Sequence, residues 1–218
     1  MVQLQGARVI LREKRMEDAE QDYIWRSDSE LARLDAAYPL TMSFERYLKI
    51  FEDQLRFPTP GSHHFSTETL DGKFIGNCMY YDLDSVNMQA ELGIVIGDRD
   101  YWSNSYGYDA VTTLLDYMFT EKKMKRVYLH TLEWNTRAQR CFEKSGFNLV
   151  KPVRRLSQDF LLMEVLREDW LKRRKSVYPP GGTSGTTLLR TKRWPNNKRR
   201  SKPQAPIKRH GQRKLSDN

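Results

Sequence analysis

Apolar residues recur along the chain with two periods, one typical of strands and one typical of helices. Alternation at every second residue predicts strands, whereas apolar residues three and four positions apart predict helices. An Asp71-Gly72 pair between two alternating runs predicts a tight hairpin, and Ser43 predicts the N-cap of a helix. The predicted strands cover residues 7–12, 64–70, 74–81, 87–96, 127–132, a segment after Gly146-Phe147, and 160–166, and the predicted helices cover 16–34, 44–55, 106–120, 136–144 and 167–175.

This order of elements predicts one mixed α/β domain over residues 1–175. Hydrophobic residues make up 39% of the chain and charged residues 30%, which is typical of a soluble globular domain. No apolar run reaches the roughly eighteen residues that a membrane span needs, so we expect no membrane insertion. The N-terminus does not resemble a signal peptide, and Cys78 and Cys141 lie far apart. We therefore expect a cytoplasmic protein with reduced thiols and no metal site.

Charge is distributed unevenly between the predicted domain and the C-terminal segment. Of the 37 Lys and Arg residues and 28 acids in the chain, twelve cations and one acid, Asp217, lie in residues 175–218. Residues 1–174 therefore carry a net charge of −2, and the excess of positive charge belongs to the tail. After residues 178–182 the composition is dominated by Pro, Gly, Ser, Thr, Asn, Lys and Arg, which predicts a disordered basic tail over residues 176–218.

The segment from residue 87 to residue 120 predicts a strand, a loop at residues 97–105 and a helix, in that order. The N-terminus of such a helix presents unpaired backbone N–H groups and the positive end of the helix dipole, which favour a phosphate or a pyrophosphate. Many α/β proteins contain such a turn without a ligand, so this pattern alone does not identify a site. It is not a P-loop, because no Gly-Lys-Ser/Thr follows.

Residues 133–147 closely resemble the N-x-x-A-x-x-x-[YF]-E-K-x-G-F signature of the GNAT acetyltransferase superfamily, with Asn135, Ala138, Phe142 and Gly146 at its defining positions. Ahead of them, residues 90–96 and 101–110 look like the acyl-CoA motif of that family, in the form Y-W-G-K-G-Y-G-T-E-A of its RimJ/RimL-like branch. The opening segments Val9-Ile10-Leu11-Arg12 and Met16-Glu17-Asp18-Ala19 are also similar to that branch. The resemblance covers residues 7 to about 168.

The resemblance implies a GNAT-like, mostly antiparallel sheet of about seven strands flanked by helices, in which strands four and five splay apart. It implies that the pantetheine arm of acetyl-CoA pairs with the fourth strand, opposite residues 127–131, and that the pyrophosphate rests on residues 103–107. Asn135 matches a position that binds the pantetheine arm or the acyl region, so it belongs to both the cofactor-binding and the catalytic set. The implied acetyl-CoA contacts are Ile94, Val95, Ile96, Ser103, Asn104, Ser105, Tyr106, Gly107 and Asn135.

Two positions depart from the family pattern. Ser103 and Ser105 stand where the family usually has glycines, so we expect acetyl-CoA binding to be weakened rather than lost. Phe142 stands where many members have the tyrosine that protonates the leaving thiolate, and phenylalanine has no proton to give. In that case the thiolate takes its proton from water.

Glu91 is the carboxylate that the pattern places best for general base catalysis, on the key strand and opposite its aliphatic row. The alternative is a solvated strand carboxylate, and both interpretations remain open. His63 and His64 point to opposite faces of a strand, so a structural role is favoured over a metal site. For His130 a packed core histidine is favoured. The aromatic residues Tyr23, Trp25, Tyr38, Phe44, Tyr47 and Phe51 are interpreted as helix core, in a region that the resemblance assigns to the acceptor side.

The resemblance favours an acetyl-CoA-dependent N-acetyltransferase that acts on a primary amine, either a protein N-terminus or a small amine. The competing hypothesis is a non-catalytic GNAT-like protein that binds RNA or the ribosome through the basic tail, because arginine-rich segments attract phosphate backbones. Asn135 and Glu91 favour the enzyme, whereas Ser105 and Phe142 favour the competing hypothesis.

Overall fold

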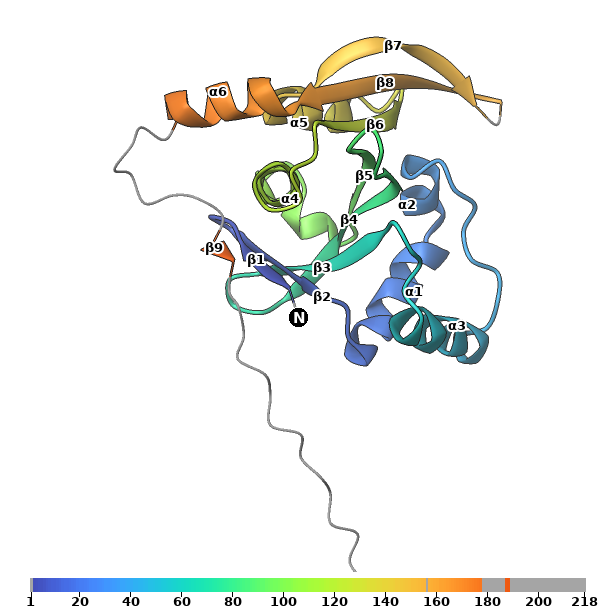
Figure 1. Ribbon diagram of the computed structural model, residues 1–218. Coiled ribbons are helices and arrows are strands. Elements are labelled where there is room, and N and C mark those ends of the chain that lie inside the picture. Colours follow the sequence, from blue (N-terminus) through green and yellow to red (C-terminus); the bar gives the residue numbers. More distant parts are fainter. Residues whose placement is uncertain (1, 156, 178–186, 189–218) are drawn as a thin grey trace, which may run out of the picture.

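One nine-stranded sheet forms the centre of the computed structural model, which describes residues 2–155, 157–177 and 187–188 (Figure 1). Neighbouring strands in it are antiparallel, with one exception: β5 (Gln89–Ile96) and β6 (Arg126–Leu132) are parallel. The spatial order is β7 (Asn148–Arg155), β8 (Gln158–Leu166), β6 (Arg126–Leu132), β5 (Gln89–Ile96), β4 (Phe74–Asp84), β3 (His63–Thr69), β2 (Val9–Glu13), β1 (Gln3–Gln5) and β9 (Thr187–Leu188).

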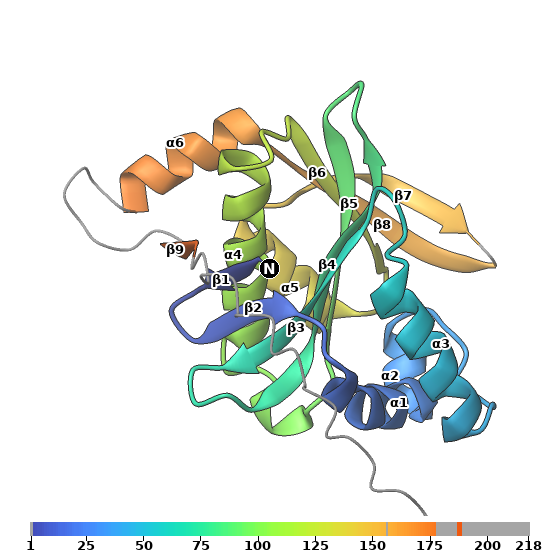
Figure 2. The same cartoon turned by 60° about the horizontal axis from the view of Figure 1, so that its bottom comes forward.

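Helices lie on both sides of the central strands. In Figures 1 and 2 the first three helices cover one side of β3–β5, and the fourth packs on the opposite side. The helices are α1 (Ala19–Ser27), α2 (Ser29–Leu34), α3 (Phe44–Arg56), α4 (Tyr106–Thr120), α5 (Thr136–Ser145) and α6 (Arg167–Val177), with short 3-10 turns η1 (Met16–Asp18) and η2 (Arg99–Tyr101). The predicted mixed α/β architecture is confirmed.

The main core forms between α4 and the sheet. The predicted apolar stripe of α4, which includes Val111, Leu114 and Met118, is fully buried. It faces Ala90 and Leu92 of β5, among other strand residues. Burial of such a stripe supplies most of the stability of an amphipathic helix, so α4 is firmly held against β5.

The strands β5 and β6 separate after a short paired stretch. Their parallel pairing covers only Gln89–Glu91 and Arg126–Tyr128. Beyond it, β5 stays paired with β4 as far as Ile96, and β6 stays paired with β8 as far as Leu132. Each strand therefore presents one unpaired backbone edge to the gap between them, as the family resemblance implied.

Local signals in the sequence account for several element boundaries. The Ser43 side chain accepts a hydrogen bond from the backbone N–H of Arg46, as expected for an N-cap. The Asp71-Gly72 turn joins β3 to β4, and Gly72 adopts a φ of 90° that favours glycine. The predicted helical region 16–34 is divided at Asp28, whose carboxylate caps α2 by accepting from the N–H groups of Glu30 and Leu31.

The sheet has two short strands that the pattern did not predict, β1 and β9. β9 pairs with β1 and contains the only residues beyond α6 that the structure describes. The predicted disorder of the rest of the tail, and its predicted contact with RNA or the ribosome, lie outside the described residues. Within the described part of the chain, no helix is long and apolar enough to cross a membrane.

Candidate active site

The loop between β5 and α4 keeps a backbone conformation that is usual for glycine. Ser103 has a φ of 60° and Ser105 a φ of 65°, both in the left-handed region. These are the two serines that stand where the resembling family has glycines. A side chain in this region costs about 1–2 kcal/mol, so the surrounding fold holds the loop in this shape against a local preference.

The loop ends at the N-terminus of α4. Ser105 is the N-cap, and the first helical hydrogen bond runs from the N–H of Asp109 to the carbonyl oxygen of Ser105. The N–H groups of Tyr106, Gly107 and Tyr108 therefore have no partner within the helix. Together with the helix dipole they provide the donors and the positive potential that a pyrophosphate requires.

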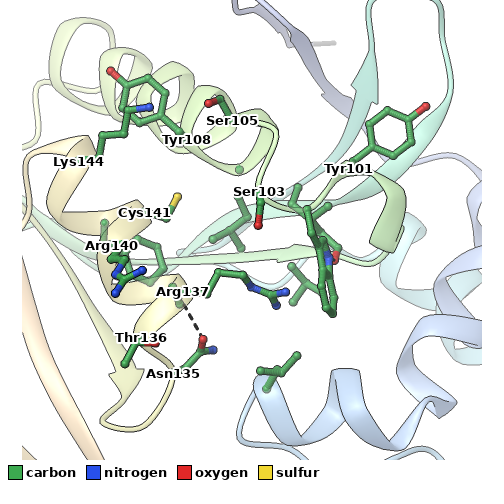
Figure 3. A pocket seen from close by; sticks show the side chains of 18 of the residues that line it. Tyr101, Ser103, Ser105, Tyr108, Asn135, Thr136, Arg137, Arg140, Cys141 and Lys144 are labelled. Carbon is green, nitrogen blue, oxygen red and sulfur yellow. Dashed lines mark hydrogen bonds between the residues drawn. The ribbon is translucent and has the colours of Figure 1, made fainter.

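A cavity of about 590 Å³ opens beside this loop (Figure 3). It lies between the free edge of β5, the β5–α4 loop and α5, and the end of α2 closes one side. Its size lies in the range of small-molecule sites. The lining residues are Leu31, Leu34, Asp35, Ile94, Val95, Ile96, Tyr101, Trp102, Ser103, Ser105, Gly107, Tyr108, Asn135, Thr136, Arg137, Ala138, Arg140, Cys141, Phe142 and Lys144.

Seven of the residues that the resemblance assigned to acetyl-CoA binding line this cavity: Ile94, Val95, Ile96, Ser103, Ser105, Gly107 and Asn135. Two do not. Asn104 is exposed, and its side chain donates to the carbonyl oxygen of Asp100. The ring of Tyr106 packs edge-on against Tyr101, with the centroids 4.8 Å apart. For Tyr106 only the backbone N–H remains available to a ligand at the helix start.

Asn135 caps the helix on the opposite wall. Its Oδ1 accepts a hydrogen bond of 3.2 Å from the N–H of Ala138, drawn as the dashed line in Figure 3. The side chain is largely buried, and its amide nitrogen stays available as a donor to the cavity. Asn135 thus positions α5 and also supplies a polar group to the cavity.

Three cations on one face of α5 also reach the cavity, a feature that we did not identify in the sequence. Arg137, Arg140 and Lys144 follow one another at spacings of three and four residues, so the helical period was the available signal. The guanidinium of Arg137 lies 3.6 Å from the ring centroid of Trp102. Trp102 in turn donates a hydrogen bond of 2.7 Å to the carbonyl oxygen of Ile96. These contacts tie the loop to both β5 and α5.

Phe142 and Cys141 occupy the α5 wall. Phe142 is buried, lines the cavity and packs edge-on against Phe147 at 5.9 Å. No hydroxyl group is present at this position. Burial raises the pKa of the Cys141 thiol, which therefore stays protonated at neutral pH.

Glu91 lies at the last paired position of β5 and β6. It is buried, and its Oε1 lies 2.8 Å from Nδ1 of His130. Tyr81, opposite Glu91 on β4, has a raised pKa because of burial and the nearby Glu91 charge. The interpretation of Glu91 as a solvated carboxylate is therefore wrong. Glu91 is not among the residues that line the cavity beside α4.

A second cavity, of about 770 Å³, lies between α1–α3 and the sheet. Tyr47 and Phe51 are buried beside it, as predicted for helix core. Tyr38 contradicts that prediction, because it is 95% exposed in the connection after α2. His63 stacks on Phe65 at 4.1 Å and lies within hydrogen-bonding distance of a carboxylate, in keeping with a structural role. No cluster of three metal-binding side chains occurs in the described part of the chain.

Comparison with known proteins identifies the family. Residues 8–148 match the family described as acetyltransferase (GNAT) domain. An uncharacterized N-acetyltransferase (p20) of Bacillus licheniformis is 26% identical over 148 residues, which cover 67% of this chain and 83% of that protein.

Two solved structures have the same fold. Spermidine N-acetyltransferase from Vibrio cholerae, in complex with CoA and spermine, gives a TM-score of 0.68 at 19% identity, covering 75% of this chain and 98% of that one. A GNAT-family acetyltransferase from Bacillus anthracis gives 0.66 at 18% identity, covering 76% and 99%. Together with the family match over residues 8–148, the likeness in fold leads to one conclusion: the chain belongs to the GNAT acetyltransferase family and is an N-acetyltransferase.

Proposed function

We propose that this N-acetyltransferase moves an acetyl group from acetyl-CoA to a primary amine, on a small molecule or at a protein N-terminus. The observation that carries the proposal is the unpaired edge of β5, which opens into a cavity that ends at the N-terminus of α4. The strand edge suits the amide groups of the pantetheine arm, and the helix N-terminus suits the pyrophosphate. The motif at residues 101–110 further supports assignment to the RimJ/RimL-like branch.

The cations of α5 strengthen the fit to a polyphosphorylated substrate. Arg137, Arg140 and Lys144 line the same cavity as the loop, on the wall formed by α5. Their positive charges would attract the phosphates of acetyl-CoA. Ser103 and Ser105 keep the loop conformation, so the backbone donors stay in place without the glycines. Binding through backbone groups and α5 cations is compatible with both substitutions.

Transfer requires a defined path for two protons. The amine nitrogen attacks the carbonyl carbon of the thioester, the C–S bond breaks, and the new amide and CoA thiolate form. One proton leaves the nitrogen for a proton acceptor, and the thiolate takes up one proton. Phe142 cannot supply the second proton, so we propose that water supplies it.

Two carboxylates are candidates for the proton acceptor. We propose Glu91, as expected from the sequence, acting with His130 beside it. Asp35 is the second candidate, because it lines the acetyl-CoA cavity and the cavity of α1–α3 at once. Asn135 is proposed to hold the acyl region through its amide nitrogen.

Calorimetric titration of the full chain with acetyl-CoA is the direct test of the proposal. We expect saturable binding with a stoichiometry of one, and loss of that binding when Gly107 is replaced by Val. A release assay for the free CoA thiol then reports transfer to added amines. Absence of binding at millimolar acetyl-CoA would refute the proposed function.

A further inference from the structure

The cavity between α1–α3 and the sheet meets the acetyl-CoA cavity at three residues. Leu31, Asp35 and Val95 line both. Figure 1 shows α1–α3 gathered on the side of β4 and β5 away from α4. A molecule in the second cavity therefore approaches the free edge of β5 from the side opposite the α4 core, and it reaches that edge beside Asp35.

Most charged side chains of the second cavity already have partners of opposite charge. Asp22 is 2% exposed, accepts a hydrogen bond of 2.5 Å from Asn77 and lies 3.4 Å from Nζ of Lys14. Oε1 of Glu13 lies 3.1 Å from Nε2 of His63. Asp22 and Lys14 therefore offset each other's charge, and the Glu13 carboxylate is held by His63.

Arg26 and Asp35 also line the cavity, and neither forms a salt bridge with another described residue, although the charge of Arg26 acts on Asp35. Arg26 is exposed to the cavity, with its guanidinium 6.0 Å from the ring centroid of Tyr47. Asp35 is likewise open to solvent through the cavities. Burial among the cavity walls raises the pKa of Asp35 to about 6, and the positive charge of Arg26 opposes this rise. The two groups are thus close enough to interact, and both are ionised at neutral pH.

The positions of the two charges differ with respect to the acetyl-CoA cavity. Asp35 lines both cavities, whereas Arg26 lines only the second one. The walls of the second cavity carry both polar and apolar side chains. The apolar lining residues of the second cavity include Trp25, Leu40, Phe51, Leu55 and Met79.

We propose that the acceptor is an amino carboxylate, a small molecule that carries its amine and a carboxylate together, with the amine at Asp35 and the carboxylate at Arg26. This inference rests on the proposed transferase function and narrows its acceptor. Asp35 holds the amine at the junction, where the nitrogen meets the acyl group. Arg26 pairs with the carboxylate through its planar guanidinium, which suits bidentate binding.

A polycationic amine fits this arrangement less well. When one of its amines lies at Asp35, a second charged amine lies near the like charge of Arg26, and the ligand offers that guanidinium no carboxylate. Like charges in a partly apolar cavity repel, because the local dielectric screens them less than water does.

Matched pairs of acceptors test the inference. Thiol release from acetyl-CoA is measured with phenylalanine and leucine, with their C-terminal amides, and with spermidine. Each amide keeps the amine and the side chain and removes the negative charge, which also lowers the pKa of the amine. We expect kcat/KM to be at least tenfold higher for each free acid than for its amide, and higher for the free acids than for spermidine.

Variants of the two charged residues assign the preference to the cavity. Arg26→Gln should remove the preference for free acids through a rise in their KM, and Arg26→Lys should restore the preference in part. Arg33→Gln is the matched control, because Arg33 is an exposed cation of α2 that lies 4.5 Å over the Trp134 ring and does not line the second cavity. Asp35→Asn should lower kcat/KM for both the free acids and the amides, since both carry the amine.

The outcomes separate the inference from the proposed function. Equal or better kcat/KM for the amides or for spermidine, with acetyl-CoA bound normally, would overturn the amino carboxylate and leave the transferase in place. A preference for acids that survives in Arg26→Gln would overturn the role of Arg26. Binding of acetyl-CoA without transfer to either free acid would also count against the inference, whereas absence of acetyl-CoA binding would refute the transferase itself.

Discussion

Replacement of Ser105 by glycine should stabilise the protein and leave acetyl-CoA binding intact. Ser105 holds a φ of 65° as the N-cap of α4, and its side chain makes no capping hydrogen bond. The hydroxyl therefore contributes nothing visible to the helix start. The Cβ atom, by contrast, carries the cost of the left-handed conformation.

The size of the effect follows from two opposing contributions. Relief of the left-handed strain contributes about 1–2 kcal/mol to the free energy of unfolding. The greater freedom of glycine in the unfolded chain removes about 0.5–1 kcal/mol. The net gain lies between about 0 and 1.5 kcal/mol, which corresponds to a rise in Tm of up to about 6 °C for a domain of this size.

Thermal unfolding and calorimetric titration with acetyl-CoA measure the two expected results. Ser29→Gly is the matched control, because Ser29 begins α2 with a negative φ and its replacement adds only the entropy of glycine. This control should lower Tm, whereas Ser105→Gly raises it. A lower Tm in Ser105→Gly would refute the assignment of strain. A tenfold loss of acetyl-CoA affinity, about 1.4 kcal/mol, would instead make the hydroxyl a ligand.

Four further outcomes are expected. Gly107→Val should abolish acetyl-CoA binding in calorimetry. It should change Tm little, because a Cβ at this position lies 3.7 Å or more from other protein atoms. Retained affinity would show that the pyrophosphate does not bind at the start of α4. Glu91→Gln should slow transfer on the order of 10²-fold or more at unchanged acetyl-CoA affinity, and unchanged kinetics would remove Glu91 from the reaction. The Tm advantage of Asp35→Asn over the native chain should grow from pH 4 to pH 7, because the raised pKa of about 6 makes ionisation of Asp35 unfavourable for folding; a constant difference would contradict the shift. Deletion of residues 179–218 should remove any RNA affinity and its dependence on salt, and equal RNA binding by the shortened chain would place that affinity in the domain.

The cavity that we propose for acetyl-CoA could be located from the sequence because most of its parts are contiguous there. The free edge of β5, the loop and the start of α4 follow one another within residues 89–107. Most of their contribution comes from the backbone, so the order of strand, loop and helix, together with the family resemblance, was enough to locate them. Asn135 was predictable for a similar reason, since it begins α5 within the second motif.

The acceptor side could not be predicted in the same way. Arg26 belongs to α1, Asp35 follows α2, and Val95 belongs to β5. These residues meet only after α1–α3 pack on the sheet, and no periodic pattern encodes that packing. The contact between Glu91 and His130 also could not be predicted, because it depends on the register between β5 and β6. The two missed strands, β1 and β9, are three and two residues long, too short to establish an alternating pattern.

The two serines and Phe142 should affect catalysis differently, because the loop acts through its backbone, whereas the position of Phe142 acts through its side chain. A site built from backbone groups tolerates a change of side chain when the fold still imposes the dihedral angles, and the left-handed φ at Ser103 and Ser105 meets that condition. Phe142 removes a functional group, and no backbone conformation replaces a hydroxyl. The serines should therefore affect stability more than acetyl-CoA affinity, whereas Phe142 should affect kcat and leave acetyl-CoA affinity unchanged. The acceptor preference depends on neither, because it is determined by the side chains of Arg26 and Asp35 on the opposite side of β5.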